Sequence, residues 1–245
     1  MKPDREPAEA TAASAEERDR KAEHIHLALE ERMQVPLHPF DRLAFIPNAL
    51  PEIDRAAIDF GASFLGKSLR APWLISCMTG GTELATRINR RLATAAEATG
   101  IAVGVGSQRK AIEDPHLAAS FRMREYAPSA PILANLGAVQ LNYGFGLDEC
   151  RAAVEMVDAD ALVFHLNPLQ EAIQPEGQCD FSGLLDKMGD IAAKIGVPVI
   201  AKEVGSGISP ATARLLQGVG IEIIDCAGVG GTSWALIEAA RAADA

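Results

Sequence analysis

The sequence predicts an α/β fold built on a parallel sheet. Short apolar runs, many of them β-branched, alternate along the chain with Gly-rich or polar turns and with amphipathic stretches of helical length. The run Ala161–Phe164 contains no polar residue, which is typical of a strand that is covered on both faces. Repetition of this βα unit indicates parallel strands that are joined by helices.

Six strands and five helices follow from this pattern. The strands are expected at residues 73–76, 101–105, 131–135, 161–165, 198–202 and 221–226. The helices are expected near residues 83–99, 116–124, 147–157, 181–195 and 209–217.

Every expected strand ends in residues that can contact a ligand. A doubly wound sheet concentrates such groups at a switch point, so their presence after all six strands favours a TIM-type (β/α) barrel with its site on one face. A complete barrel takes about 250 residues, whereas residues 73–245 hold about six βα units. We therefore expect an α/β barrel that is truncated after the sixth strand. Its exposed sheet edges favour pairing with another copy, and we expect a homo-oligomer.

The amino-acid composition argues against several classes of binding partner. A net charge of -10 argues against general binding to nucleic acid or to anionic membranes, because both need a basic face. The apolar runs are strand-sized, far below the roughly 20 residues of a membrane span. The four cysteines are widely separated and show no zinc-finger spacing, which fits reduced thiols in a cytoplasmic protein.

We expect residues 1–19 to form a disordered leader, 20–72 an N-terminal substrate-binding segment and 73–245 the barrel.

The segment after Phe164 carries the strongest signal for chemistry. His165, Asn167, Gln170 and Glu171 follow the buried strand within seven residues. Ligands meet parallel sheets at the carboxyl ends of their strands, so these groups predict a polar site there.

Charged groups elsewhere fit an anionic ligand. Lys202 closes an apolar strand, a position that is costly unless the ammonium group meets negative charge. Arg109 follows Ser107 and Gln108 at the end of another strand, and Arg20 and Lys21 add fixed positive charge if their segment folds back over the barrel mouth.

Seven short motifs, taken in order, identify a family. They are RKAEHI at 20–25, MTGG at 78–81, GSQR at 106–109, ANLG at 134–137, HLNPLQE at 165–171, KEVG at 202–205 and GVGGTS at 228–233. In sequence and spacing they resemble the type 2 isopentenyl diphosphate isomerases, the FMN-dependent class. The resemblance implies a barrel enzyme of isoprenoid biosynthesis that interconverts isopentenyl and dimethylallyl diphosphate with reduced FMN, Mg²⁺ and NADPH as reductant.

The resemblance also implies roles for individual residues. Glu171 is the metal ligand, and His165, Gln170 and Lys202 take part in catalysis. The substrate contacts are Arg20, Lys21, His24, Ser107, Gln108, Arg109, Asn167 and Gln170. The flavin contacts are Cys77, Met78, Thr79, Ser107, Asn135, Lys202 and Thr232. Family members continue into two further strands whose Gly-rich loops hold the FMN phosphate.

Two other functions are consistent with the residues. One is a different flavin barrel, such as a relative of the 2-hydroxy-acid oxidases, although the chain lacks a late His-Gly-x-Arg arrangement. The other is a non-catalytic remnant of the isomerase family that acts by assembling with itself or with another chain.

Overall fold

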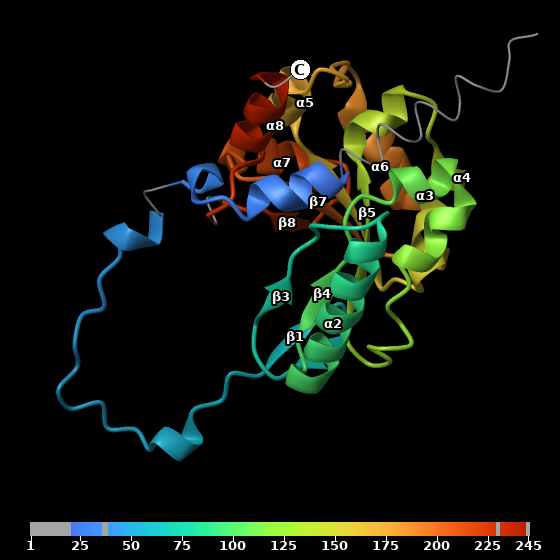
Figure 1. Ribbon diagram of the computed structural model, residues 1–245. Helices are drawn as coiled ribbons and strands as arrows, with labels where there is room; N and C mark the ends of the chain where they lie inside the picture. The colour runs from blue at the N-terminus through green and yellow to red at the C-terminus, as the bar shows by residue number, and fades with distance from the viewer. Residues whose placement is uncertain (1–20, 36–38, 229–230, 244–245) are drawn as a thin grey trace, which may run out of the picture.

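A computed structural model describes residues 21–35, 39–228 and 231–243 of the chain (Figure 1). The expected leader at residues 1–19 lies outside the described residues. Within the described part, no helix is both long and apolar enough to cross a membrane.

The centre of the molecule is a six-stranded parallel sheet. Its strands are β3 (Leu74–Ile75), β4 (Ala102–Gly104), β5 (Ile132–Gly137), β6 (Ala161–Leu166), β7 (Val199–Glu203) and β8 (Ile223–Asp225). They are hydrogen-bonded in chain order, β3-β4-β5-β6-β7-β8, and every pair is parallel. A doubly wound sheet would reverse direction at a switch point, and this sheet does not. The predicted partial (β/α) barrel is confirmed.

The helices that connect the strands include four of the five expected ones. They are α2 (Glu83–Thr99), α3 (Arg109–Glu113), α4 (Leu147–Val157), α5 (Pro168–Ile173), α6 (Leu184–Lys194), α7 (Pro210–Gly218) and α8 (Trp234–Ala243), with 3-10 helices η4 (Pro115–Ser120) and η5 (Ala138–Asn142). Helix α2 is the best-marked element, because the Thr82 side chain accepts a hydrogen bond from the Ala85 amide and Gly100 ends the helix at a φ of 66°.

The expected helix at 116–124 is the clearest error in the sequence-based assignment. Residues 115–120 form a 3-10 helix instead. Phe121 and Met123 are both fully buried, and side chains two positions apart do not share one face of an α-helix. Burying both therefore favours an irregular segment after residue 120.

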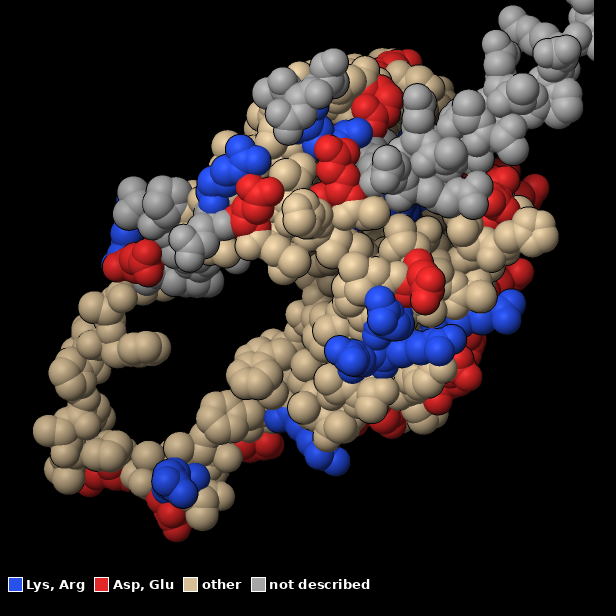
Figure 2. Space-filling model, in the orientation of Figure 1, with Lys and Arg blue, Asp and Glu red and all other residues tan. Residues whose placement is uncertain are grey.

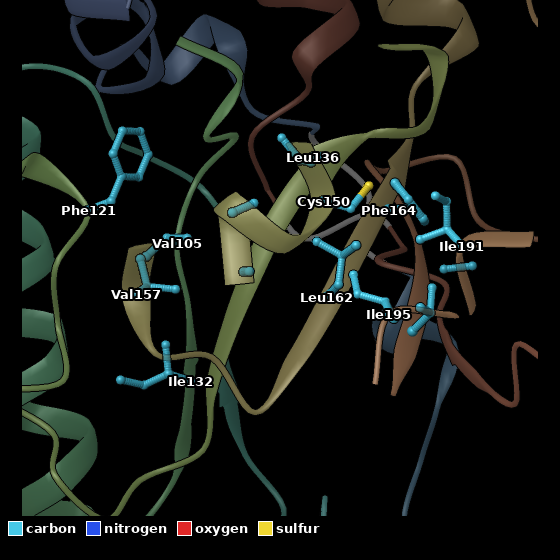
Figure 3. Packing of buried hydrophobic residues seen from close by; sticks show 14 of the residues in the cluster. Val105, Phe121, Ile132, Leu136, Cys150, Val157, Leu162, Phe164, Ile191 and Ile195 are labelled. Carbon is cyan, nitrogen blue, oxygen red and sulfur yellow. The ribbon is translucent and has the colours of Figure 1, made fainter. Parts of the chain in front are cut away.

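Both faces of the sheet are covered, as the apolar runs predicted. Leu162 and Phe164 point into the large core between the sheet and the helices (Figure 3). Ala161 and Val163 alternate with them and belong to a smaller cluster on the other face. Partly buried residues of the hairpin described below close this second cluster.

The N-terminal segment contains a hairpin that the sequence analysis missed. Strands β1 (Ala62–Phe64) and β2 (Lys67–Leu69) pair antiparallel, and the turn residues Leu65 and Gly66 have φ values of 53° and 74°. The Lys67 ammonium group lies 2.7 Å from an Asp160 carboxylate oxygen, just before β6. The hairpin thus lies at the amino ends of the strands, opposite the expected site.

The rest of the segment divides into two parts. Residues 21–28 form a helix, followed by η1 (Glu31–Met33). Residues 43–60, between η2 (Pro39–Arg42) and the hairpin and containing η3 (Arg55–Ala57), run as an extended arm that stands away from the sheet (Figure 2). The arm exposes large apolar side chains, among them Phe45 and Ile46.

Candidate functional site

A cavity of about 300 Å³ lies where the carboxyl ends of the strands face the helix at residues 21–28. Thirteen of the sixteen residues expected in the site line it: Lys21, His24, Cys77, Met78, Thr79, Ser107, Arg109, Asn135, His165, Asn167, Gln170, Glu171 and Lys202. The strand ends are adjacent because the strands run parallel, which explains how residues from the ends of five strands, β3 to β7, meet. The helix at 21–28 covers the cavity from the other side.

Three expected residues are not in this cavity. Arg20 lies outside the described residues. Thr232 lines a neighbouring cavity of about 50 Å³, together with Glu203 and Gly205.

Gln108 is the third expected residue that does not line this cavity. Its side chain is fully buried, and its Nε2 donates to the Ala153 carbonyl oxygen at 2.8 Å. Its Oε1 accepts from the Asn135 amide nitrogen at 2.9 Å. The side chain thus ties β5 to α4, and it satisfies backbone groups that would otherwise be buried without partners.

A half-buried histidine and a buried amide form the floor of the cavity. His165 Nδ1 lies 2.8 Å from Asn135 Oδ1, and Asn135 Nδ2 donates to the Val105 carbonyl oxygen at 3.2 Å. The amide therefore turns its oxygen toward the ring, so Nδ1 carries the proton and Nε2 is left as an acceptor. Burial, together with the charges of Lys202 and Lys21, lowers the pKa of His165 to about 3. The imidazole is neutral near pH 7.

Lys202 supplies positive charge deep in the cavity. It is 5% exposed, and its Nζ donates to the Glu203 carbonyl oxygen at 2.7 Å. Cys77 lies close to it at the end of β3; burial raises the pKa of this thiol to about 12, although Lys202 opposes the shift. Cys77 is therefore a neutral thiol, and a buried ammonium group of this kind favours an anionic ligand.

Glu171 is held at the start of α5, where Pro168 occupies the first turn. Its Oε1 accepts from Asn167 Nδ2 at 3.0 Å, and its Oε2 accepts from the Gln178 amide at 2.7 Å. Asn167 and Gln140 also line the cavity, and Asn167 Oδ1 and Gln140 Oε1 are buried without a hydrogen-bond partner among the described residues. One carboxylate and two unpaired amide oxygens form a donor set that suits a hard cation.

The ionisable side chains near Glu171 in the described part of the chain are too few to hold a metal ion without other ligands. Within the described ranges, no cluster of three or more His, Cys, Asp or Glu side chains could hold a metal ion. A divalent cation here would take its remaining ligands from water or from a bound anion.

Lys21 joins the covering helix to the sheet. Its Nζ donates to the Ser107 carbonyl oxygen at 3.2 Å and lies 5.4 Å from the centre of the Phe121 ring. Lys21 and Arg109 both line the cavity and bring two positive charges to it.

Helix α8 contributes residues that the sequence analysis missed. Glu238 is completely buried behind the cavity wall, and its Oε1 accepts from Gln170 Nε2 at 3.1 Å. His24 Nε2 lies 3.0 Å from the same oxygen. This distance suits an ion pair, but the angle does not suit a hydrogen bond. The His24 ring also meets the Trp234 ring edge-on, with centroids 5.2 Å apart.

A signal for these residues was present in the sequence. Trp234, Ile237, Glu238 and Arg241 are spaced i, i+3, i+4 and i+7, so two charged residues interrupt the apolar face of a helix. Charges on such a face are buried only with partners, and this marks them as candidates for a role at a site.

The fold and the cavity together define a (β/α)-barrel protein with a cavity at the carboxyl ends of the strands. A comparison with protein-family models finds no match. The chain is 16% identical to a lactate oxidase from Pediococcus acidilactici, with a TM-score of 0.47 over 82% of this chain and 56% of that one.

Curated relatives give the family. The chain is 54% identical over 237 residues to an isopentenyl-diphosphate delta-isomerase from Nostoc, a match that covers 96% of this chain and 68% of the relative. It is 52% identical to the isopentenyl-diphosphate delta-isomerase of Synechocystis, covering 92% of this chain and 65% of that protein. The chain belongs to the isopentenyl-diphosphate delta-isomerase family of enzymes, as its motifs predicted. It spans about two thirds of the length of these relatives.

Proposed function

We propose that the cavity binds isopentenyl diphosphate and interconverts it with dimethylallyl diphosphate, using reduced FMN and Mg²⁺. The observation that carries the proposal is the convergence of thirteen expected residues on one cavity at the carboxyl ends of the strands. The names of relatives about 50% identical to the chain support the choice of substrate.

The diphosphate is assigned to the cationic wall. Lys21, Arg109 and Lys110 line the cavity, while Arg109 Nε also contacts the Glu113 carboxylate at 3.0 Å. Arg20 precedes Lys21 and is assigned to the same group. Basic side chains of this kind bind phosphate oxygens by charge-assisted hydrogen bonds.

Glu171 is assigned to Mg²⁺. The buried, unpaired oxygens of Asn167 and Gln140 fit this assignment, since both residues line the same cavity as Glu171. A bound Mg²⁺ supplies charge neutralisation for the diphosphate. Asn167 would hold the carboxylate through its Nδ2 while its Oδ1 stays available.

The flavin is assigned to the wall formed by Cys77, Met78, Thr79, Ser107, Asn135 and Lys202, with Thr232 in the adjoining cavity. The buried Lys202 ammonium group donates a hydrogen bond to the neutral Glu203 carbonyl oxygen. Its positive charge therefore favours an anionic flavin ring nearby. Reduced FMN supplies acid-base chemistry at the substrate carbons when it is bound. NADPH is the proposed reductant.

The protein groups are suited to a reaction that moves protons without net redox change. Neutral His165 presents an acceptor nitrogen to the cavity, and Gln170 presents an amide oriented by Glu238. The helix at 21–28 and Trp234 cover the cavity, which limits the access of water to a cationic substrate carbon. Assembly as a homo-oligomer and a cytoplasmic location stay predictions.

Flavin binding tests the assignment of Lys202. In an anaerobic titration with reduced FMN, Lys202→Met should weaken binding about tenfold or more, because a charged hydrogen bond worth roughly 1.5–3 kcal/mol is lost. Lys194→Met, which removes an exposed lysine of α6, is the matched control and should bind like the unmodified protein. Equal affinities for both variants would contradict the flavin assignment.

A further inference from the structure

We propose that Arg241 is a positioning residue that holds His24 and Gln170 in place through the carboxylate of Glu238. Arg241 does not line the cavity. The effect on catalysis rests on the proposed function, whereas the effect on the position of the covering helix does not.

The guanidinium group of Arg241 joins three parts of the chain. Its Nη1 donates to Glu238 Oε2 at 2.6 Å within α8, and its Nε donates to Glu23 Oε2 at 2.9 Å on the covering helix. Its Nη2 lies 3.2 Å from Glu176 Oε1, in the loop after α5. Each nitrogen thus contacts a different part of the chain. The side chain therefore fixes the covering helix and the loop after α5 relative to α8.

Glu238 transmits this restraint to the cavity. Arg241 binds one oxygen of the carboxylate, and the other oxygen contacts Gln170 Nε2 and His24 Nε2. The charge-assisted hydrogen bond from Arg241 Nη1 to Glu238 Oε2 restrains the carboxylate. The oxygen that faces the cavity is therefore held at one angle, and both cavity residues follow it.

The burial of these groups separates the arrangement from an ordinary surface ion pair. The side chains of Arg241 and Glu238 are 13% and 0% exposed. Exposed ion pairs contribute little, whereas removal of one partner of a buried pair leaves an uncompensated charge. Without Arg241, the Glu238 carboxylate must take up a proton, turn toward water or draw His24 and Gln170 out of position.

Apolar contacts keep the covering helix attached when Arg241 is replaced. Leu27 and Met33 pack against Ile237 of α8, and all three are buried. A variant at Arg241 should therefore fold with its helix docked but less exactly placed, which allows its positioning role to be measured.

The experiment compares Arg241→Met and Arg241→Lys with Arg124→Met. Arg124 also binds two carboxylates, those of Asp158 and Asp160, but it lies at the amino end of β6, away from the cavity. All variants are made in a Trp73→Phe background, so that fluorescence reports on Trp234, and are measured where unfolding curves show them folded.

The first readout is acrylamide quenching of Trp234, which contacts His24. Arg241→Met should increase quenching, Arg241→Lys should fall between it and the parent protein, and Arg124→Met should match the parent. Quenching of Arg241→Met equal to that of Arg124→Met would overturn the proposal.

The second readout is turnover of isopentenyl diphosphate. Arg241→Met should lower kcat about tenfold or more with a smaller change in KM, since a displacement near 1 Å can cost about a hundredfold in rate, and Arg241→Lys should recover part of the loss. A kcat equal to that of Arg124→Met would overturn the catalytic part. If the parent protein shows no turnover, the proposed function fails and the quenching result still decides the positioning role.

Discussion

The imidazole Nδ1 of His165 lies 2.8 Å from the amide oxygen of Asn135, 30 residues earlier in the chain. The two side chains meet because Gly137 and His165 pair in the parallel ladder between β5 and β6, two positions beyond Asn135. This pair fixes the tautomer of the ring and leaves one basic nitrogen facing the cavity.

Exchange of the amide for a carboxylate tests the electrostatics of this pair. Asn135→Asp should raise the pKa of His165 from its value of about 3, because a negative charge at Nδ1 favours the imidazolium and opposes the effects of burial and of Lys202. Nitrogen-15 NMR of the labelled histidines across a pH series measures the change. Asn48→Asp adds the same charge on the exposed arm and should leave His165 unchanged. An unshifted His165 in Asn135→Asp would contradict the assigned contact.

Glu238 makes stability depend on acid pH. Burial opposes its ionisation, but the contacts with His24, Gln170 and Arg241 outweigh burial and lower the pKa from 4.5 to about 2. A carboxyl group with a lowered pKa stabilises the fold above its unfolded pKa, and this contribution is lost as the pH falls through 4.5 toward 2. Glu238→Gln should therefore flatten the pH dependence of the unfolding free energy in this window.

Urea unfolding at several pH values measures this effect. Glu125→Gln, which changes an exposed glutamate, should keep the slope of the parent protein. If Glu238→Gln and Glu125→Gln gave the same slope, the carboxylate of Glu238 would not be ionised as described.

Gln108 and Ser107 should respond differently to substitution although they are adjacent. Gln108→Leu removes the buried partners of the Asn135 amide and the Ala153 carbonyl, which should cost roughly 1–3 kcal/mol for each unsatisfied group. Ser107→Ala alters the cavity wall and should weaken ligand binding with little loss of stability. Denaturant unfolding and FMN titration separate the two effects. Weaker binding without loss of stability in Gln108→Leu would restore the sequence-based assignment.

Gly106 has little room for a side chain. A Cβ atom there would lie 2.5 Å from the Thr79 carbonyl carbon, and backbone cannot move aside cheaply. Gly106→Ala should destabilise the fold by about 1–3 kcal/mol, as overpacking does. Gly218→Ala, with no atom within 4 Å of the added Cβ, should be neutral or slightly stabilising. Thermal unfolding distinguishes these outcomes, and equal midpoints would contradict the close approach of the two loops.

The sequence analysis predicted correctly the elements that have strong local sequence patterns. Helix α2 begins and ends at the predicted residues because a threonine cap and a glycine stop surround it. The strands were found because unbroken apolar runs reflect burial on both faces. The cavity was anticipated because parallel strands deliver their carboxyl ends to one edge.

The errors came from contacts that are distant along the chain. The hairpin β1–β2 is stabilised by packing beneath the sheet, and its turn carries one glycine after Leu65 instead of a stronger turn pair. Gln108 looked like its neighbours in the motif, yet its orientation depends on unsatisfied groups of β5 and α4. Glu238 became visible as a site residue once α8 was placed beside Gln170.

Conversion of isopentenyl diphosphate tests the central claim most directly. Purified protein is incubated anaerobically with FMN, Mg²⁺, NADPH and labelled substrate, and the dimethylallyl isomer is measured against a protein-free control. We expect conversion by the parent chain, loss of Mg²⁺-dependent conversion in Glu171→Gln, and conversion at the parent level in Glu222→Gln, which changes an exposed carboxylate. Absence of conversion by the parent chain, with a full-length relative active in the same buffer, would contradict the proposed function.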